Sequence, residues 1–525
     1  MKKILVLFLC LTVVLSTMAL LPVSAEANVW DGCTVSTALE GAGTADNPYL
    51  IATGADLALM RQEINAGNVL YSAASYKQTA DIDLNGYCVE PIGPTKDAGA
   101  FLNGVYDGAG FTISNYVVNS GSKYVGLFGY VAGTYIENVK VAKAYVSSSS
   151  AESSSAVGTL VAYIDSSSEV SGCSTAADCY VESINIARVG GLVGWNYSSI
   201  IKNCVNRATA IYAGTNACYI GGITGTTGKD GALVENCVNV GPVIVQAAGG
   251  NNKIIVGGIV GIAGGSTGTN ETKNCYNAGA VACIFEYAAQ DVGLGGITGN
   301  NNKGQNTVTD CYNVGPLYYT SGTYNPEKNY IGSITGYAPT ETVEASGCFA
   351  LTQDSIPAIA KPACDGMALI TDVSSIKNAL TAIDTAVATA LGIECDWAQA
   401  SYDVTIGAAT VEATIAAQEA ILAILDSAPQ QGEAKGDTPA ETDPTPAETE
   451  PTPTETEPTP AETDPTPAET DPTPAETDPT PAETDPTPAV TEPATTGGCG
   501  SAIGTSFAAV ALVSIFGMAY VAKRK

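Results

Sequence analysis

Histidine is absent from the 525 residues of this chain, and tryptophan (3) and methionine (5) are scarce. Without histidine, the chain lacks the commonest general base, the Ser-His and Cys-His nucleophile pairs, and every zinc site that uses histidine. Basic residues are also few, since 22 Lys and Arg stand against 53 Asp and Glu, a formal net charge of −31. Such acidity argues against a nucleic-acid partner. We therefore expect no cofactor, no metal site and no nucleic-acid ligand.

Residues 1–25 are predicted to be a signal peptide. Lys2 and Lys3 precede an apolar run that ends in the small-residue sequence Val23-Ser24-Ala25. A signal peptidase cuts after such a pattern, so we expect cleavage between Ala25 and Glu26. The apolar run is long for a signal peptide, and a retained membrane anchor is the alternative.

Residues 501–525 are predicted to be a transmembrane anchor with a basic cytoplasmic tail. The stretch 502–522 is uncharged and apolar, and Lys523-Arg524-Lys525 follow it directly. A helix that spans a bilayer needs about 20 such residues, and basic residues stay on the cytoplasmic side. The preceding chain is then exported and displayed at the cell surface. A soluble hydrophobic helix is the alternative, and the Leu-Pro-x-Thr-Gly signal for covalent wall attachment is absent.

Residues 431–500 are predicted to form a disordered stalk. From Asp437 onward a seven-residue unit close to PTPAETD repeats, with almost no apolar side chain larger than alanine. Such a segment cannot build a core, and its prolines favour extended polyproline-II geometry. The stretch from Asp437 to Glu492 holds 16 acidic residues and no basic one. Much of the acidity of the chain thus belongs to a spacer.

One short phrase recurs seven times between residues 122 and 350, in forms such as "VGLFG", "VGGLVG" and "IGGITG". Its central apolar residue recurs every 31 to 38 positions, at Leu127, Leu160, Leu192, Ile223, Ile259, Ile297 and Ile334. The surrounding runs are short, β-branched and bounded by Gly, Asn, Ser or Thr. This pattern predicts three short strands per repeat, coiled into an all-β parallel solenoid.

A second phrase places a cysteine at one position in six of the seven repeats, with Val139 in the first. The six are Cys173, Cys204, Cys237, Cys275, Cys311 and Cys348. A position that accepts Val or Cys is typical of an interior slot for a small apolar side chain. We therefore expect a column of buried free thiols, although an exported chain more often forms disulfides. The sequence does not decide between a free thiol and a disulfide for the cysteines outside the column, which are Cys33, Cys88, Cys179, Cys218, Cys283, Cys364 and Cys395.

The residues around this cysteine column indicate two further features. The position before it is Asn, Asp or Gly in every repeat, for example Asn203 and Gly172. These residue types tolerate positive φ, so we expect a left-handed corner there. Two positions after the cysteine, Asn206, Asn239, Asn277 and Asn313 form their own column. Their stacked amides can hydrogen-bond from coil to coil as a ladder.

These phrases resemble the GLUG-repeat family of bacterial cell-surface proteins, over roughly residues 41–350. The resemblance implies a right-handed parallel β-helix, secreted or surface-attached, with adhesin-like roles. Some members carry a zinc peptidase domain, whose motif this histidine-free chain lacks. We accordingly divide the chain into an N-terminal cap with the first coils (26–121), GLUG-type repeats (122–350), and a helical C-terminal cap or neck (351–430).

Helices are predicted at both ends of the repeats. Residues 53–67 form a short helix with Thr53 as N-cap, Asp56 three positions on and Gly67 as its stop. Residues 372–392 and 408–428 are Ala-rich with apolar residues at helical spacing, and we expect them to cap the last coil or form a neck.

Three functions fit this organisation. The first is a surface-displayed adhesin or binding protein, whose partners are surface glycans or proteins of a host or of microbes. The second is a structural envelope component without a specific ligand, and the third is a carbohydrate-active enzyme, for which the repeats offer few carboxylates. For the first, an exposed tyrosine strip is the expected contact surface, and packing at coil edges is the alternative for the same residues. The candidates are Tyr212, Tyr219, Tyr312, Tyr318, Tyr319 and Tyr330.

Overall fold

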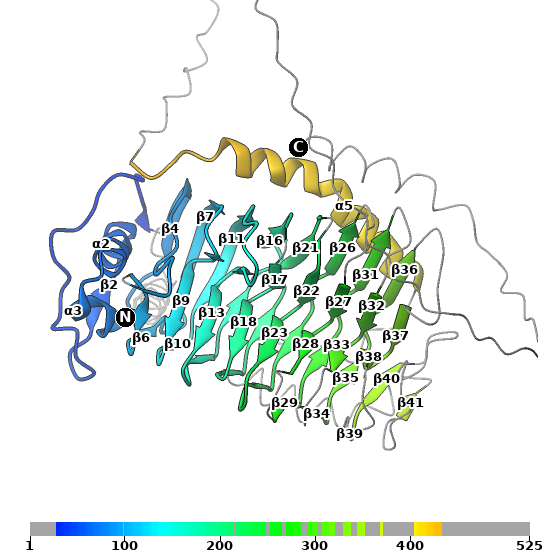
Figure 1. The fold of residues 1–525 in the computed structure, drawn as a ribbon. Coiled ribbons are helices and arrows are strands. Elements are labelled where there is room, and N and C mark those ends of the chain that lie inside the picture. The colour runs from blue at the N-terminus through cyan, green and yellow to red at the C-terminus, as the bar shows by residue number, and fades with distance from the viewer. Residues whose placement is uncertain are drawn as a thin grey trace, which may run out of the picture. The chain divides into compact units, whose positions relative to one another are not determined.

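Each of the seven repeats forms one coil of a parallel β-solenoid, in which strands pair with the equivalent strands of the neighbouring coils (Figure 1). The predicted all-β parallel solenoid is thereby confirmed. The structure is a computed structural model. It describes residues 28–351 except 98, 186, 215, 248–252, 265–268, 286–290, 302–305, 321–328 and 338–343, together with 368–370 and 404–432.

Four parallel sheets form the walls of the solenoid, and two of them carry the phrase that recurs in the sequence. Sheet D consists of β8 (Tyr124–Val125), β12 (Ala156–Gly158), β17 (Ala187–Gly190), β22 (Cys218–Gly221), β27 (Lys253–Gly257), β32 (Asp291–Gly295) and β37 (Asn329–Gly332). Sheet C consists of β5 (Phe101–Leu102), β9 (Phe128–Ala132), β13 (Val161–Asp165), β18 (Val193–Tyr197), β23 (Thr224–Gly228), β28 (Val260–Ala263), β33 (Thr298–Asn301) and β38 (Thr335–Tyr337).

Sheet B follows in the chain and begins before the first full repeat. Its strands are β2 (Tyr49–Ile51), β3 (Ser75–Gln78), β6 (Val105–Asp107), β10 (Tyr135–Glu137), β14 (Glu169–Ser171), β19 (Ile200–Lys202), β24 (Leu233–Glu235), β29 (Asn270–Lys273), β34 (Asn306–Thr309) and β39 (Glu344–Ser346).

Sheet A closes each coil, with one long strand in the early coils (β4, β7, β11) and with two short strands from β15 and β16 onward. It comprises β1 (Asn28–Val29), β4 (Ile82–Cys88), β7 (Thr112–Ser120), β11 (Lys140–Ser148), β15 (Ser174–Thr175), β16 (Tyr180–Ser183), β20 (Val205–Asn206), β21 (Thr209–Tyr212), β25 (Val238–Asn239), β26 (Val243–Ala247), β30 (Tyr276–Asn277), β31 (Val281–Phe285), β35 (Tyr312–Asn313), β36 (Leu317–Thr320), β40 (Phe349–Leu351) and β41 (Ala368–Ile370).

The predicted count of three strands per repeat is wrong, because a central coil contains five. The third coil runs through β17, β18, β19, β20 and β21. Two interruptions subdivide the expected runs: the Gly190-Gly191 pair, and Asn203, whose φ of 55° turns the chain out of strand geometry. Asn236, Asn274 and Asp310 repeat this left-handed corner with φ of 52°, 50° and 52°, which confirms the predicted turn column.

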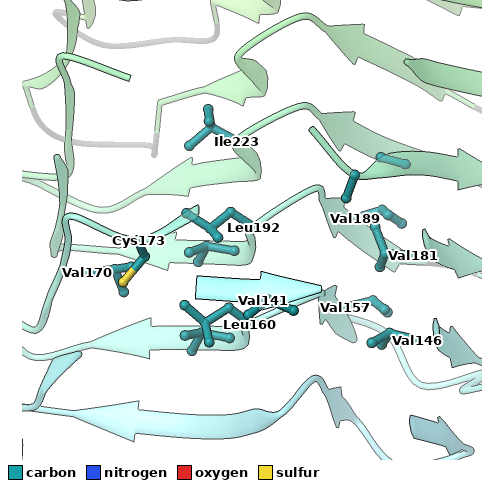
Figure 2. Close-up of a cluster of buried hydrophobic side chains, with 14 of the residues drawn as sticks. Val141, Val146, Val157, Leu160, Val170, Cys173, Val181, Val189, Leu192 and Ile223 are labelled. Atoms are coloured by element: carbon teal, nitrogen blue, oxygen red, sulfur yellow. The ribbon is translucent and has the colours of Figure 1, made fainter. Parts of the chain in front are cut away.

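The interior of the solenoid is a continuous column of aliphatic and cysteine side chains. All seven central residues of the repeated phrase, from Leu127 to Ile334, are fully buried. Figure 2 shows part of this core, with inward-pointing side chains of Val141, Val146, Val157, Leu160, Val170, Cys173, Val181, Val189, Leu192 and Ile223. Burial of such side chains is the main force that holds stacked coils together.

The predicted asparagine ladder is present inside the solenoid. The side-chain nitrogen of Asn206 donates to the side-chain oxygen of Asn239, and the same bond links Asn239 to Asn277 and Asn277 to Asn313, each at 2.8 Å. Each asparagine from Asn239 onward also donates to a backbone carbonyl two residues ahead. These bonds satisfy buried amides that would otherwise destabilise the core.

The N-terminal helix also follows its prediction. Helix α2 (Gly54–Asn65) begins after Thr53, whose hydroxyl accepts from the Asp56 amide while the Asp56 carboxylate accepts from the Thr53 amide. Gly67 stops it with a φ of 77°, and α3 (Val69–Ser72) follows. The two helices lie at the first coils of the solenoid (Figure 1).

Helix α5 (Val404–Ser427) falls where a C-terminal helix was predicted, but it does not cap the end of the last coil; the alternative, a neck that leads to the stalk, stays a prediction. It runs along the outer face of sheet A, from β36 back to β11 and β7 (Figure 1). Its apolar residues Ile421 and Leu425 pack on that sheet with Val117 and Ile211. The helix thus shields outward-facing apolar side chains of sheet A from water.

The segment after α5 returns to the N-terminal end of the solenoid. The Cys88 amide donates to the carbonyl of Pro429, and the Gly432 amide donates to the carbonyl of Gly32. Gln431 accepts a hydrogen bond from Arg61 of α2. The described chain therefore starts and ends beside the same cap.

Several predicted segments lie outside the described residues: the signal peptide with Ala25 and Glu26, the helix at 372–392, the stalk at 437–496, and the anchor at 502–522. Within the part of the chain that the structure describes, no helix is long and apolar enough to cross a membrane.

Candidate functional site: an aromatic face on sheets C and D

Two outward-facing columns run side by side along sheets D and C. On sheet D, Tyr124, Ala156, Arg188, Tyr219 and Ile255 are register partners in successive coils. On sheet C, the corresponding partners are Tyr130, Tyr163, Trp195, Thr226 and Ile262. In each coil only the recurring phrase of the sequence separates the two columns, so their side chains lie side by side.

Five rings of the first three coils form one connected aromatic cluster, and Tyr219 of the fourth coil joins it through Arg188. We call this surface the aromatic face: Tyr124, Tyr130, Tyr163, Trp195, Tyr197 and Tyr219. Tyr163 is its centre, with ring centroids 5.2 Å from Tyr124, 5.1 Å from Tyr130, 4.9 Å from Trp195 and 6.0 Å from Tyr197. Tyr124, Tyr130 and Tyr163 are buried, whereas Trp195, Tyr197 and Tyr219 are partly exposed.

Glycine brings the two columns together. A Cβ on Gly190 would lie 1.9 Å from the carbonyl oxygen of Val193, and one on Gly194 would lie 2.6 Å from the backbone nitrogen of Val157. Only glycine permits this close approach of backbones, which folds sheet C against sheet D. The side chains that flank the repeated phrase consequently converge.

Arg188 is the charged group of the aromatic face. Its guanidinium carbon lies 3.8 Å from the ring centre of Trp195 and 5.5 Å from that of Tyr219. Burial lowers the pKa of Arg188 from its usual value, and the nearby tyrosines oppose that shift. No ion pair links Arg188 to a carboxylate of the described residues. The nearby carboxylates form ion pairs with other residues: Asp165 pairs with Lys96, and Glu152 pairs with Lys123.

Buried polar groups without partners gather on these columns. Arg188 Nε, Trp195 Nε1, Thr226 Oγ1 and both side-chain amide atoms of Asn300 have no hydrogen-bond partner among the described residues. Asn300 continues the Trp195 column two coils beyond Thr226. Each unpaired buried group costs roughly 1–3 kcal/mol, so this set is a row of unused hydrogen-bonding capacity.

The predicted tyrosine strip is wrong as a set. Tyr212 points inward and is fully buried, with its hydroxyl bonded to the backbone of Asn216, and Tyr312 is also buried. Tyr318 packs into the apolar cluster beneath α5, and Tyr319 packs edge-on against Phe285. These four side chains follow the alternative of packing. Tyr212 and Tyr319 contact the interior core, Tyr318 contacts the cluster beneath α5, and Tyr312 is buried.

Two tyrosines of that strip lie on the outer column of sheet D. Tyr219 belongs to the aromatic face, and Tyr330 stacks on Tyr337 at 4.5 Å in the last coil. Trp195 and Arg188 were not predicted from the sequence as site residues. Their signal is positional, because they directly flank the phrase in "RVGGLVGW", just as Tyr124 and Tyr130 flank "VGLFG" and Tyr330 and Tyr337 flank "IGSITG".

The cysteine column lies inside the solenoid, away from the aromatic face. All six members are buried free thiols, and each donates weakly to backbone carbonyls, such as Cys275 to Lys273 at 3.2 Å. Burial raises the pKa of Cys173 and Cys204 well above the usual value. Cys88, Cys179, Cys218 and Cys283 are also buried and free, and Cys33 is exposed and free.

We expect native alkylation to separate these thiols. Iodoacetamide at pH 8 should modify Cys33 and spare the ten buried cysteines, because the reagent cannot reach a buried sulfur. Peptide mass mapping measures this, and the same reagent in urea should modify all eleven. A disulfide-linked peptide that joins two neighbours in the column would contradict the expectation.

Carboxylates approach one another most clearly on the outer face of sheet B. Glu137 lies near Glu169, and burial together with the charges of Glu169 and Asp107 raises the pKa of Glu137. Lys202 lies 2.9 Å from Glu169 and neutralises it. No group of three or more potential metal ligands occurs among the residues that the structure describes.

A cavity of about 640 Å³ lies between α5 and sheet A. Ala413, Ala417 and Ile421 line it from the helix, and Tyr145 and Asp178 line it from the solenoid. Its walls are mostly apolar, with few polar groups to orient a ligand. The aromatic face, by contrast, combines rings, an unpaired cation and unused hydrogen-bonding groups.

Comparisons with known proteins give partial matches. The chain is 37% identical over 128 residues to halomucin of Haloquadratum walsbyi, which is 22% of this chain and 1% of that protein. It is 34% identical over 92 residues to a protein of Evansella cellulosilytica named as a Gly-rich membrane protein, or 17% of this chain and 10% of the relative. The chain thus spans a small fraction of the length of these relatives, and no protein-family model matches it.

Two solved structures are similar to part of this chain in their backbone structure. One, from Bacteroides ovatus, is named as an immunoglobulin A1 protease, with 21% identity and a TM-score of 0.44 over 65% of this chain and 89% of that one. The other is named IgA1 Protease, with 14% identity and a TM-score of 0.38 over 57% of this chain and 21% of that one. With TM-scores below 0.5, neither likeness bears on activity.

Proposed function

We propose that this protein is a surface-displayed binding protein of the adhesin type, with the aromatic face as its contact surface for glycans. The observation that carries the proposal is the convergence of Trp195, Tyr197 and Tyr219 with the unpaired Arg188. Partly exposed rings provide stacking surface for the apolar faces of sugars, and the partly exposed guanidinium of Arg188 provides a charged hydrogen-bond donor.

The architecture supports this proposal. The predicted export signal, acidic stalk and membrane anchor would present the solenoid beyond the cell envelope, as the proposed membership of the GLUG-repeat family also implies. The names of the two relatives, halomucin and a Gly-rich membrane protein, agree with a surface or membrane context. The carboxylates of sheet B support the alternative of a carbohydrate-active enzyme less strongly than the aromatic face supports a binding protein, because Glu169 is held in an ion pair with Lys202.

A glycan array probed with purified full-length protein tests the proposal. We expect saturable binding to one class of glycan, and a roughly 2-fold to 10-fold weaker affinity after Trp195→Ala, since one stacked ring contributes about 0.5–1.5 kcal/mol. Tyr135→Ala is the matched control, because Tyr135 is 44% exposed on sheet B and lies outside the aromatic face. An array without binding, or equal losses in both variants, would refute the aromatic face as the contact surface.

A further inference from the structure

We propose that Arg188 makes the aromatic face selective for acidic polysaccharides, by binding the carboxylate of a uronic or sialic acid unit that stacks on Trp195 and Tyr197. This inference rests on the proposed function and adds the ligand class. It assigns the guanidinium to the carboxylate and the two rings to the face of the sugar.

The charge arrangement favours an anionic ligand. Arg188 is half-buried among rings, and its Nε is buried without a hydrogen-bond partner among the described residues. Lys229 Nζ lies 5.6 Å from the ring centre of Tyr197. Each of the two rings thus has a cation beside it, Arg188 at Trp195 and Lys229 at Tyr197, whereas Lys96 and Lys123 elsewhere on this face are paired with acids. A carboxylate would give Arg188 the charge-assisted, two-pronged hydrogen bonds that its guanidinium is shaped to make.

The ring geometry favours a sugar over an acidic peptide. Trp195 and Tyr197 are perpendicular, with an interplanar angle of 88° and centroids 5.6 Å apart. Gly228 of the next coil leaves room for both rings, since a Cβ there would lie 2.9 Å from Trp195 Nε1. A sugar ring has an apolar face that can stack on one of these partly exposed rings while its carboxylate reaches Arg188. The carboxylate of an acidic peptide would engage Arg188 but would bring no ring face to stack on Trp195 or Tyr197.

The repetition of the columns matches a polymer. Their register partners recur once per coil, at roughly 4.8 Å, and Tyr330 with Tyr337 repeats the paired rings in the last coil. A polysaccharide chain laid along the solenoid would therefore meet apolar, aromatic and polar positions in sequence, with Arg188 as its charged contact.

Binding of defined oligosaccharides to the full-length protein tests this inference. The probes are oligomers of polygalacturonate, alginate, hyaluronan and polysialic acid, the carboxyl-reduced form of each, and polyglutamate. We expect at least one carboxylated oligomer to bind more tightly than its reduced form. Arg188→Gln should weaken that binding roughly 10-fold to 100-fold and abolish the preference, since hydrogen bonds to charged groups contribute about 1.5–3 kcal/mol. Arg188→Lys should bind with an affinity between those of the unchanged protein and Arg188→Gln, because lysine keeps the positive charge but lacks the planar guanidinium that makes two parallel hydrogen bonds.

Arg207→Gln is the matched control, since it removes the same charge from a part-exposed arginine outside both columns, and it should leave binding unchanged. Protection of the buried cysteines from iodoacetamide verifies that each variant is folded. Equal binding of carboxylated and reduced oligomers would overturn the selectivity but leave the proposed function standing. Preferential binding of polyglutamate would overturn the sugar assignment. Binding of none of the oligomers, with an empty glycan array, would overturn both proposals.

Discussion

Replacement of Asn277 by alanine is expected to lower the free energy of unfolding by about 3 kcal/mol, because it interrupts the asparagine ladder inside the solenoid. Asn277 is fully buried, accepts from Asn239 and donates to Asn313, both at 2.8 Å. It also donates to the carbonyl of Gly279 at 3.0 Å. The substitution leaves an amide hydrogen of Asn239 and the Gly279 carbonyl unpaired, without access to water. The midpoint of urea unfolding of the full-length protein measures the loss.

Asn119→Ala is the matched control for this loss. Asn119 is exposed, and its side chain makes one long bond of 3.4 Å to the carbonyl of Leu425. We expect a change within about 0.5 kcal/mol, as for most surface substitutions. If both variants unfold at the same urea concentration, the ladder does not stabilise the solenoid.

Replacement of Gly258 by alanine is expected to destabilise the protein by at least about 3 kcal/mol, at the upper end of the range for overpacking. The added Cβ would lie 2.1 Å from the carbonyl oxygen of Gly296 and 2.4 Å from the side-chain carbon of Asn277. The first contact is with the backbone of the next coil, so relief requires separation of two coils. Thermal unfolding followed by circular dichroism measures the effect.

Gly121→Ala is the control, since a Cβ there would meet only the Ser149 hydroxyl, at 3.6 Å. We expect that variant to unfold like the unchanged protein. The double variant Gly258→Ala with Asn277→Ala should cost less than the sum of the two single changes, because removal of the Asn277 side chain relieves one of the two clashes. Strict additivity would show that the glycine and the ladder do not share the same space.

The path of the C-terminal helix changes how the domain is built. Because α5 follows sheet A back toward the cap, the chain leaves the described domain beside Gly32 and Cys88, not at the last coil. Ile421 and Leu425 cover an outer apolar row of sheet A in doing so. The helical pattern in the sequence located this helix, but a helix with an apolar stripe fits any apolar surface of suitable length. The choice between the end and the side of the solenoid needed the outward rows of sheet A.

By itself, the sequence determined the features that repeat. The recurrence of Leu127 through Ile334 determined seven coils, the residue type at positions such as Asn203 determined the left-handed corners, and the column from Asn206 to Asn313 determined the amide ladder. The Thr53–Asp56 capping box determined the start of α2. Each of these is fixed by local backbone preference or by stacking of identical positions, and both can be read from one period of the chain.

Only the tertiary structure decided which side chains share a surface. Tyr212 is of the same residue type as Tyr219, yet strand alternation places its side chain inside the solenoid. Arg188 and Trp195 are seven residues apart, and their 3.8 Å contact exists because Gly190 and Gly194 let sheets C and D approach. Their positions beside the recurring phrase mark these residues in the sequence, but the contact between them depends on how sheets C and D pack.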